Sequence, residues 1–268
     1  MMNKVIRRAG MLASSVLVPR SRRHIRQVRG PGFELLAFVN EDVGRVIWLT
    51  GSFEPEETRY FQREIRPGDV CFDVGGNVGY MAMLFASAAR DGQVHVFEPI
   101  DVNAAMIQAN ATLNGFDNVS VNNVAVGAAS GEVTFSVSND SAYSSMRPTG
   151  RSAEARSIQV PMLSLDEYAA QHGIGRVDIL KADVEGAEEM VLEGAQQLLS
   201  DHTRRPRIVL LELFDNNLTP FGSSVERCIE RMAGFGYRPY VIKPGTDQMT
   251  PFRPEMSNVL YNILFLPE

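Results

Sequence analysis

The chain is poor in cysteine and histidine, with two and four of these residues among 268. Two cysteines cannot form the disulfide framework of a small secreted domain. Cys71 lies in a predicted buried strand, as expected for a thiol in a reducing compartment. None of the histidines falls at a predicted strand end, where catalytic groups gather in open α/β sheets. Acids are therefore the stronger candidates for proton transfer.

No segment is long and apolar enough to be a transmembrane helix. The apolar run at residues 9–18 has about ten residues, against roughly 20 that a bilayer requires. It follows basic residues, as in a signal peptide, but it lacks a convincing small-residue cleavage site and an arginine cluster follows it. The sequence therefore predicts a cytoplasmic protein without stable membrane insertion.

Acidic residues are missing from the start of the chain. Eight basic residues precede the first acid, Glu34: Lys4, Arg7, Arg8, Arg20, Arg22, Arg23, Arg26 and Arg29. The rest carries 18 basic and 32 acidic residues, and a body with a net charge of −14 is a poor general binder of nucleic acid. We interpret the basic arm as a packed or solvated extension. A membrane surface, an acidic partner or a second copy in a homo-oligomer are the alternatives.

The rest of the chain is organised around residues 70–84, VCFDVGGNVGYMAML, a predicted buried strand that turns through glycines into a helix. The glycines let the backbone turn sharply with a ligand against it. The turn GGNVG differs from the GxGxxG of dinucleotide sites. It resembles motif I of the Rossmann-like S-adenosylmethionine-dependent methyltransferases. The resemblance implies a cofactor site at Asp73, Gly75, Gly76, Asn77 and Gly79; a plain tight turn is the alternative.

A second acid, Glu98, ends the next predicted strand, residues 93–98. Its separation from Asp73 is about that of the ribose-binding acid in a βαβ nucleotide site. We expect its carboxylate to accept hydrogen bonds from both ribose hydroxyls, with Pro99 next to it and Ile100 on an adenine face. A solvated charge at the strand end is the alternative.

The third parallel strand is predicted at residues 119–126. Asn123, Val124 and Ala125 near its end fall where Rossmann-like methyltransferases read the adenine edge, although asparagines also serve plain turns. A polar stretch at residues 139–157 follows, with Arg147, Arg151 and Arg156. It could be a lid or an acceptor-binding loop.

The second chemically dense stretch is VDILKADVEGAEE, residues 177–189. Asp183 stands at the carboxyl end of a predicted strand, where open α/β sheets place ligands and catalytic groups, and Glu185 follows two residues later. We expect Glu188 and Glu189 to be solvated. Glu212, near the end of a predicted fifth strand at residues 208–213, is a third candidate acid.

Several blocks in this order resemble the FkbM family of methyltransferases. They are PGDVCFDVGGNVG, FEP with its following helix, LSLDEY, LKADVEGAEEMVLEGA and IVLLEL, within residues 54–213. The resemblance implies a Rossmann-like class I methyltransferase fold, S-adenosylmethionine as donor, and an oxygen acceptor on a sugar, polyketide or related small metabolite. Ala182 departs from the larger aliphatic residue expected there, which should affect packing rather than chemistry.

The predicted fold is α/β, with a seven-stranded, mostly parallel sheet whose last strand is antiparallel and with helices on both faces. Residues 54–268 form this domain, and residues 1–53 form a basic extension with a hairpin. The hairpin is predicted from the apolar segments 33–39 and 45–49, which flank a polar turn.

Methylation of an alcohol requires a group that takes its proton. Asp183, Glu185 or Glu212 could accept it directly, or Asp183 and Glu212 could hold Mg²⁺ that lowers the hydroxyl pKa. The motif NPPY of many N-methyltransferases is absent, and ADVEG stands in its place. N-methylation of a small metabolite or peptide, and a non-catalytic module that binds the donor, remain the alternatives. The glycine turn argues against a dehydrogenase.

Overall fold

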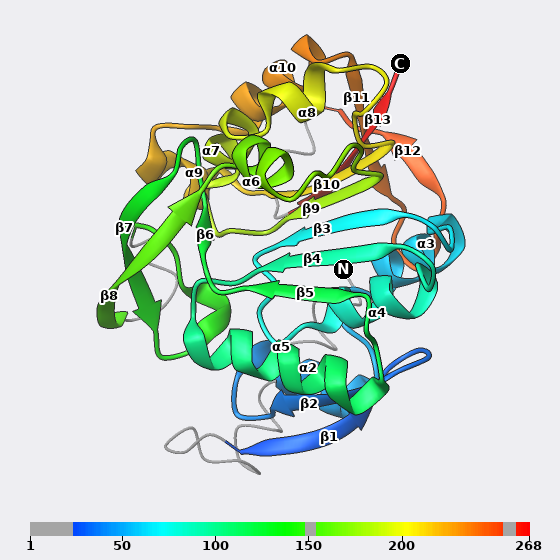
Figure 1. Cartoon of the computed structure of the whole chain (residues 1–268), viewed down its shortest axis with the longest axis vertical. Coiled ribbons are helices and arrows are strands. Elements are labelled where there is room, and N and C mark those ends of the chain that lie inside the picture. Colours follow the sequence, from blue (N-terminus) through cyan, green and yellow to red (C-terminus); the bar gives the residue numbers. More distant parts are fainter. Residues whose placement is uncertain (1–23, 148–153, 254–260) are drawn as a thin grey trace.

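A mixed sheet of eight strands forms the centre of the computed structural model, which describes residues 24–147, 154–253 and 261–268 (Figure 1). Its order is β12 (Met249–Pro251), β11 (Tyr237–Ile242), β13 (Tyr261–Pro267), β10 (Ile208–Leu213), β9 (Ile179–Ala182), β3 (Val70–Val74), β4 (Gln93–Phe97) and β5 (Val119–Asn122). The five strands from β10 to β5 are parallel, and β13 is antiparallel to both of its neighbours. The predicted α/β sheet is therefore confirmed, but the count of seven was wrong. The short strand β12 adds an edge because the chain reverses between Lys243 and Gln248.

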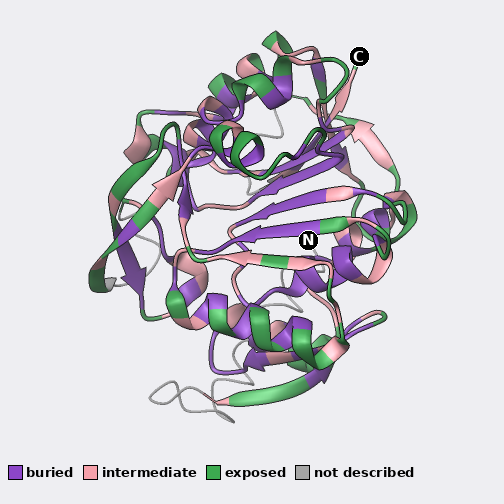
Figure 2. Ribbon diagram, in the orientation of Figure 1, coloured by how far each residue is buried: buried purple, intermediate pink, exposed green. Residues whose placement is uncertain are grey.

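Helices cover both faces of this sheet. The first face packs against α3 (Pro55–Glu64), α4 (Tyr80–Ala88) and α5 (Asp101–Asn114). The second face packs against α6 (Leu165–Gln171), α7 (Glu188–Glu193), α8 (Gln196–Ser200) and α10 (Val225–Gly234). Successive residues of a strand point to opposite faces, so Cys71 joins the first core and Phe72 the second. Figure 2 shows the central strands almost entirely buried.

The N-terminal extension contains a hairpin followed by a helix. β1 (Ile25–Arg29) pairs antiparallel with β2 (Glu34–Phe38), and α2 (Asp42–Thr50) comes next. The predicted hairpin partner at residues 45–49 was therefore wrong, because Val43, Val46 and Ile47 follow a helical spacing that places Ile47 in the core. The partner of β2 comes instead from the basic arm.

The extension is docked firmly on the main domain. Asn110 of α5 donates to the Leu36 carbonyl at 3.0 Å and accepts from the Leu36 amide at 2.6 Å. Asn114 makes the same pair of bonds with Glu34, at 2.7 and 2.8 Å. Two asparagines thus satisfy backbone groups of β2 that would otherwise lie unpaired at a sheet edge. The part of the arm before residue 24, with the apolar run 9–18, lies outside the described residues.

A second sheet lies beyond the carboxyl ends of the parallel strands (Figure 1). It consists of β6 (Ala125–Val126), β8 (Glu154–Leu163) and β7 (Gly131–Ser138), in that order. The predicted strand at residues 119–126 is therefore two strands in two sheets, because the chain leaves the main sheet at Asn123. The short helix η1 (Ser141–Tyr143) follows β7, and α9 (Asp215–Leu218) and η2 (Thr219–Phe221) follow β10.

The described part of the polar stretch at residues 139–157 includes η1 and the start of β8. Arg147 donates to the Pro220 carbonyl at 2.9 Å and lies over the Phe221 ring, and Arg156 lies 3.9 Å from Asp101. Arg151 lies outside the described residues. Within the part of the chain that the structure describes, no helix has the length and apolar character needed to cross a membrane.

Candidate active site

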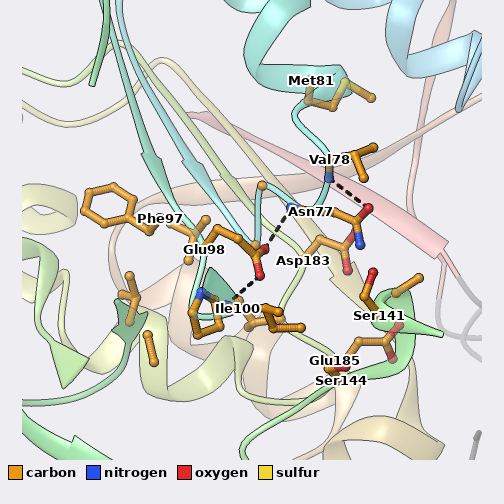
Figure 3. A pocket seen from close by; sticks show the side chains of 18 of the residues that line it. Asn77, Val78, Met81, Phe97, Glu98, Ile100, Ser141, Ser144, Asp183 and Glu185 are labelled. Atoms are coloured by element: carbon orange, nitrogen blue, oxygen red, sulfur yellow. Dashed lines mark hydrogen bonds between the residues drawn. The ribbon is translucent and has the colours of Figure 1, made fainter. Parts of the chain in front are cut away.

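A pocket that is partly open to solvent lies where the parallel strands end. Its walls come from the turns after β3, β4 and β9, from β6 and β7, and from η1. Figure 3 shows Glu98 and Ile100 on one side, and Asp183, Glu185 and Ser141 on another. Apolar clefts with a few converging polar groups are typical of sites for small molecules and cofactors.

The glycines of the turn are needed mainly because other parts of the protein lie against them. Gly75 has a φ of +79°, and a Cβ there would lie 1.9 Å from the Asp183 carbonyl oxygen. A Cβ on Gly76 would lie 2.4 Å from a methyl group of Val96. Gly75 and Gly76 also line the cavity, but Gly79 does not and packs on Ile107. The turn after β3 is thus fitted to the turn after β9 without any ligand.

The amide groups of this turn are already hydrogen-bonded. Gly75 and Gly76 donate to the Phe97 carbonyl at 2.9 and 3.2 Å. Asn77, in the left-handed region with a φ of 50°, donates its amide to Glu98 at 2.8 Å, and its side chain accepts from Val78 at 2.8 Å (Figure 3). A phosphate would find few amides to bind here, whereas the site can offer acceptors to a cationic ligand.

Glu98 lies at the centre of this end of the cavity and is buried. Besides the Asn77 amide, its carboxylate accepts from the Ile100 amide at 2.9 Å and from Asn103 at 3.4 Å. Burial raises the pKa of Glu98 to about 7, although these hydrogen bonds act in the opposite direction. Because the Glu98 carboxylate already accepts these three hydrogen bonds, it can accept fewer from ribose hydroxyls than the sequence suggested.

The apolar wall near Glu98 includes most of the predicted adenine-side residues. Pro99, Ile100, Val124 and Ala125 line the cavity. Asn123 does not line it, because its side chain turns back to donate to the Glu98 carbonyl at 2.9 Å, as in the plain-turn alternative. Phe135 of β7 also lines the wall. Sequence reasoning missed it because nothing in β7 indicates that the second sheet closes the cavity.

Asp73 does not reach the cavity. Its side chain is fully buried, and its partner is Lys181, whose Nζ lies 3.3 Å from Asp73 Oδ1. Lys181 does line the cavity, and its Nζ lies 3.8 Å from Asp183 Oδ2. Burial lowers the pKa of Lys181, but the charges of Asp73, Asp183 and Glu54 more than offset it and raise the pKa above its usual value. Sequence reasoning missed Lys181, although a lysine inside an apolar strand was the available signal.

The three predicted catalytic acids come together. Asp183, Glu185 and Glu212 each place a carboxylate oxygen within 4.8 Å of the other two. Burial, then the charges of Asp183 and Glu185, raise the pKa of Glu212 well above its ordinary value. Glu185 has a φ of 53° and accepts from Asn217 at 2.6 Å. Asp183 and Glu185 line the cavity, and Glu212 is not among the lining residues.

A fourth acid, Glu54, stands beside this cluster, and sequence reasoning missed its role. Glu54 precedes α3 with a φ of 45°, and it accepts from Asn262, the residue paired with Glu212 across β10 and β13. Its other oxygen is buried without a hydrogen-bond partner. Burial, with the nearby charges of Glu57 and Asp183, raises the pKa of Glu54 to about 8.

The prediction that Glu188 and Glu189 are solvated was wrong. Glu188 is fully buried and accepts from the amides of Val184 and Gly186 at 3.0 and 3.3 Å, so it braces the turn that carries Asp183. Burial raises the pKa of Glu188 to about 7. Glu189 is also buried, and Arg231 pairs with it at 2.9 Å.

The N-terminal extension and the segment of residues 141–146, which includes η1, close one side of the cavity, and we call them the roof. Tyr143 donates to Asp42 at 2.8 Å, and the Asp42 amide donates to Asp140 at 2.8 Å. The hydroxyl of Ser141 bonds to Glu41. Other residues from both segments line the cavity: Val43, Phe53, Ser141, Ala142, Ser144 and Met146. The extension is therefore part of the site.

The sheet order, the glycine turn after β3 and the acid after β4 together define the class I, Rossmann-like methyltransferases. Within this class the chain belongs to a particular family, the methyltransferase FkbM domain family, whose model matches residues 73–239. This confirms the resemblance seen in the sequence.

Two curated relatives carry methyltransferase names. The 31-O-demethyl-FK506 methyltransferase FkbM of Streptomyces tacrolimicus is 31% identical over 161 residues, which cover 50% of this chain and 62% of that protein. The 2-O-methyltransferase NoeI of Sinorhizobium fredii (strain NBRC 101917 / NGR234) is 26% identical over 167 residues, covering 57% and 66%. The matched part is thus less than two thirds of either relative.

A solved structure, the methyltransferase FkbM from Methylobacillus flagellatus KT, is similar with a TM-score of 0.49 and 15% identity. The similarity covers 76% of this chain and 44% of that one.

Proposed function

We propose that the chain is an S-adenosylmethionine-dependent methyltransferase that methylates a hydroxyl group of a sugar, polyketide or other small metabolite. The observation that carries the proposal is one cavity that joins the glycine turn and Glu98 to Asp183 and Glu185, which cluster with Glu212. Family membership supports the reaction class, and the names of both curated relatives specify O-methylation.

The donor fits the end of the cavity near Glu98. The sulfonium donor supplies an electrophilic methyl group, and the residues around it have to bind and orient it in a dry site. Glu98 can accept from a ribose hydroxyl, and the apolar wall of Ile100, Ala125 and Phe135 suits a flat purine. The amides of the glycine turn already donate within the protein, so they are not free to bind a phosphate. The turn therefore suits the amino acid moiety of the donor, which carries an ammonium group, better than a phosphate.

The acceptor is then expected at the acidic end, beneath the roof. Asp183 lines the cavity with its side chain about one quarter exposed, so it can meet a hydroxyl group that approaches from solvent. It would take the proton as the acceptor oxygen attacks the methyl group, a step in which a positioned base contributes typically 10²–10⁴-fold. Glu185 would orient the acceptor, and Glu212, which does not line the cavity, would act through its hydrogen bond to Asp183.

The same three carboxylates suit Mg²⁺ by chemistry, because hard cations prefer carboxylate oxygens. Asp183 and Glu212 would be the main ligands, and the ion would lower the pKa of the acceptor hydroxyl. Turnover assayed with EDTA and with added Mg²⁺ separates this route from direct proton transfer to Asp183.

The test of the proposed function is calorimetric titration with S-adenosylmethionine and S-adenosylhomocysteine. We expect both to bind the wild type and to bind Glu98→Ala at least tenfold more weakly, about 1.4 kcal/mol, because a buried acceptor is lost. Glu188→Gln is the matched control, since Glu188 is an equally buried acid with a similarly raised pKa that does not line the cavity. Absence of binding to folded wild type would refute the proposal.

A further inference from the structure

Lys181 is the only basic residue among those that line the cavity in the described part of the chain. Its side chain is 6% exposed, so the ammonium group is fixed inside the protein. Such a group has three N–H donors. The 3.3 Å contact with Asp73 is long for a hydrogen bond, and the 3.8 Å contact with Asp183 is too long for one.

The strand register explains why these three residues meet. Lys181 lies directly opposite Asp73 in the parallel pair β3–β9, so both side chains point to the same face. Asp183 is two residues further along and therefore points to that face too. Asp73 is fully buried and does not line the cavity, whereas Lys181 and the partly exposed Asp183 do.

The Asp183 carboxylate has one cation beside it, Lys181, among the residues that line the described cavity. Its other charged neighbours, Glu185 and Glu212, carry carboxylates within 4.8 Å of its own. Like charges at this distance repel, and Asp183 is exposed enough to turn toward solvent. Glu212 is hydrogen-bonded to Asp183, and Lys181 is the cation beside Asp183 that opposes this movement.

We propose that Lys181 is a positioning residue that holds the Asp183 carboxylate where donor and acceptor meet, and that Asp73 anchors Lys181. The inference rests on the proposed function, because that function places the reaction at Asp183. It also changes the expected role of the acid in the glycine-turn motif. Asp73 acts through Lys181 and does not contact the donor.

Three variants test the inference. Lys181→Met keeps the length of the side chain and removes its charge, Lys181→Arg keeps the charge, and Asp73→Asn weakens the anchor. Titration with S-adenosylhomocysteine should give affinities for Lys181→Met and Asp73→Asn within about threefold of wild type, whereas Glu98→Ala loses at least tenfold. A loss in Asp73→Asn equal to that in Glu98→Ala would overturn the anchoring role.

The position of Asp183 is read directly from crystal structures of the wild type and Lys181→Met, without ligand and with S-adenosylhomocysteine. We expect the Asp183 carboxylate to turn away from the cavity in Lys181→Met and to stay in place in Lys181→Arg. An unmoved Asp183 in Lys181→Met would overturn the inference. If Lys181→Met does not fold, the same comparison between wild type and Asp73→Asn decides, with displacement again the expected result.

Turnover adds a readout that a purely structural role would not produce. With S-adenosylmethionine and the methyl glycoside on which the wild type is most active, Lys181→Met should lose at least about tenfold in kcat with an unchanged KM for the donor. Lys181→Arg should recover most of that loss. Failure of the wild type to bind S-adenosylhomocysteine would refute the proposed function, while the ligand-free crystal structures would still decide the role of Lys181.

Discussion

The two ends of the cavity are built differently. At the donor end, the turn amides donate within the protein and Glu98 accepts three hydrogen bonds. At the acidic end, one oxygen of Glu54 has no hydrogen-bond partner, and two residues, Glu54 and Glu185, have left-handed backbones, against Asn77 alone among the non-glycine residues of the donor end. The glycine turn and Glu98 are hydrogen-bonded before any ligand arrives. The acidic end holds repulsion and strain that a ligand or a proton can relieve, which is common at reactive sites. We therefore expect the donor end to govern affinity and the acidic end to govern rate.

The largest expected effect comes from Asp183→Asn, which separates rate from affinity. We expect kcat on a methyl glycoside to fall by about 10²–10⁴-fold, because the amide cannot take the acceptor proton. The affinity for S-adenosylhomocysteine, measured by calorimetry, should stay near that of the wild type. Near-normal turnover would remove Asp183 from the mechanism, and a parallel loss of affinity would show that the two ends are not separate.

Gly75→Ala tests the contact between the two ends. A Cβ would collide with the Asp183 carbonyl at 1.9 Å, and the φ of +79° is strained for alanine. We expect the free energy of unfolding to fall by about 3 kcal/mol or more, from overpacking and backbone strain together. Gly115→Ala is the matched control, since it has a φ of +65° and nothing within 4 Å. It should lose only about 1 kcal/mol. The two free energies of unfolding are measured by chemical denaturation. Equal losses in Gly75→Ala and Gly115→Ala would mean that the collision with the Asp183 carbonyl does not destabilise the protein.

The free energy of unfolding should also depend on pH, because a buried acid lies at each end of the cavity: Glu98 at the donor end and Glu188 beneath the turn that carries Asp183. Burial raises the pKa values of Glu98 and Glu188 from 4.5 to about 7. Between these values the folded protein holds protons that the unfolded chain has released, so the free energy of unfolding falls as pH rises from about 4.5 to 7. The ligand-free protein should therefore melt at a lower temperature at pH 8 than at pH 5.5. Glu188→Gln should reduce this difference, and a melting temperature that rises with pH would contradict the prediction.

The donor end could be read from sequence because its parts are local. The strand, the turn and the helix follow one another from Val70 to Ala88, and Glu98 ends the next strand. Alternation and glycine spacing carry this information. The sequence could not show that Asp73 is screened from the cavity by Lys181, because that depends on the register between β3 and β9.

The acidic end could be read only in part. Asp183, Glu185 and Glu212 were predicted because each stands near a strand end, where ligands gather in such sheets. Glu54 precedes α3, more than a hundred residues before Asp183 in the sequence. It accepts a hydrogen bond from Asn262, near the end of the chain, and Asn262 is paired with Glu212. Residues 45–49 were misread as a strand because a short apolar segment fits both periodicities. Contacts between distant segments are set by packing, which no local pattern records.

The smallest expected effect comes from the roof, where Tyr143→Phe removes the hydrogen bond to Asp42. That bond joins η1 to α2 at 2.8 Å, and a hydrogen bond to a charged group contributes about 1.5–3 kcal/mol when buried and less when partly exposed. A loss of about 1 kcal/mol should lower the melting temperature by about 2–4 °C. The affinity for S-adenosylhomocysteine should not change, because the donor end is held together without the roof, whereas the KM for a methyl glycoside should rise. Loss of donor affinity would instead mean that the roof closes over both ends, and that the acidic end and the donor end form a single unit.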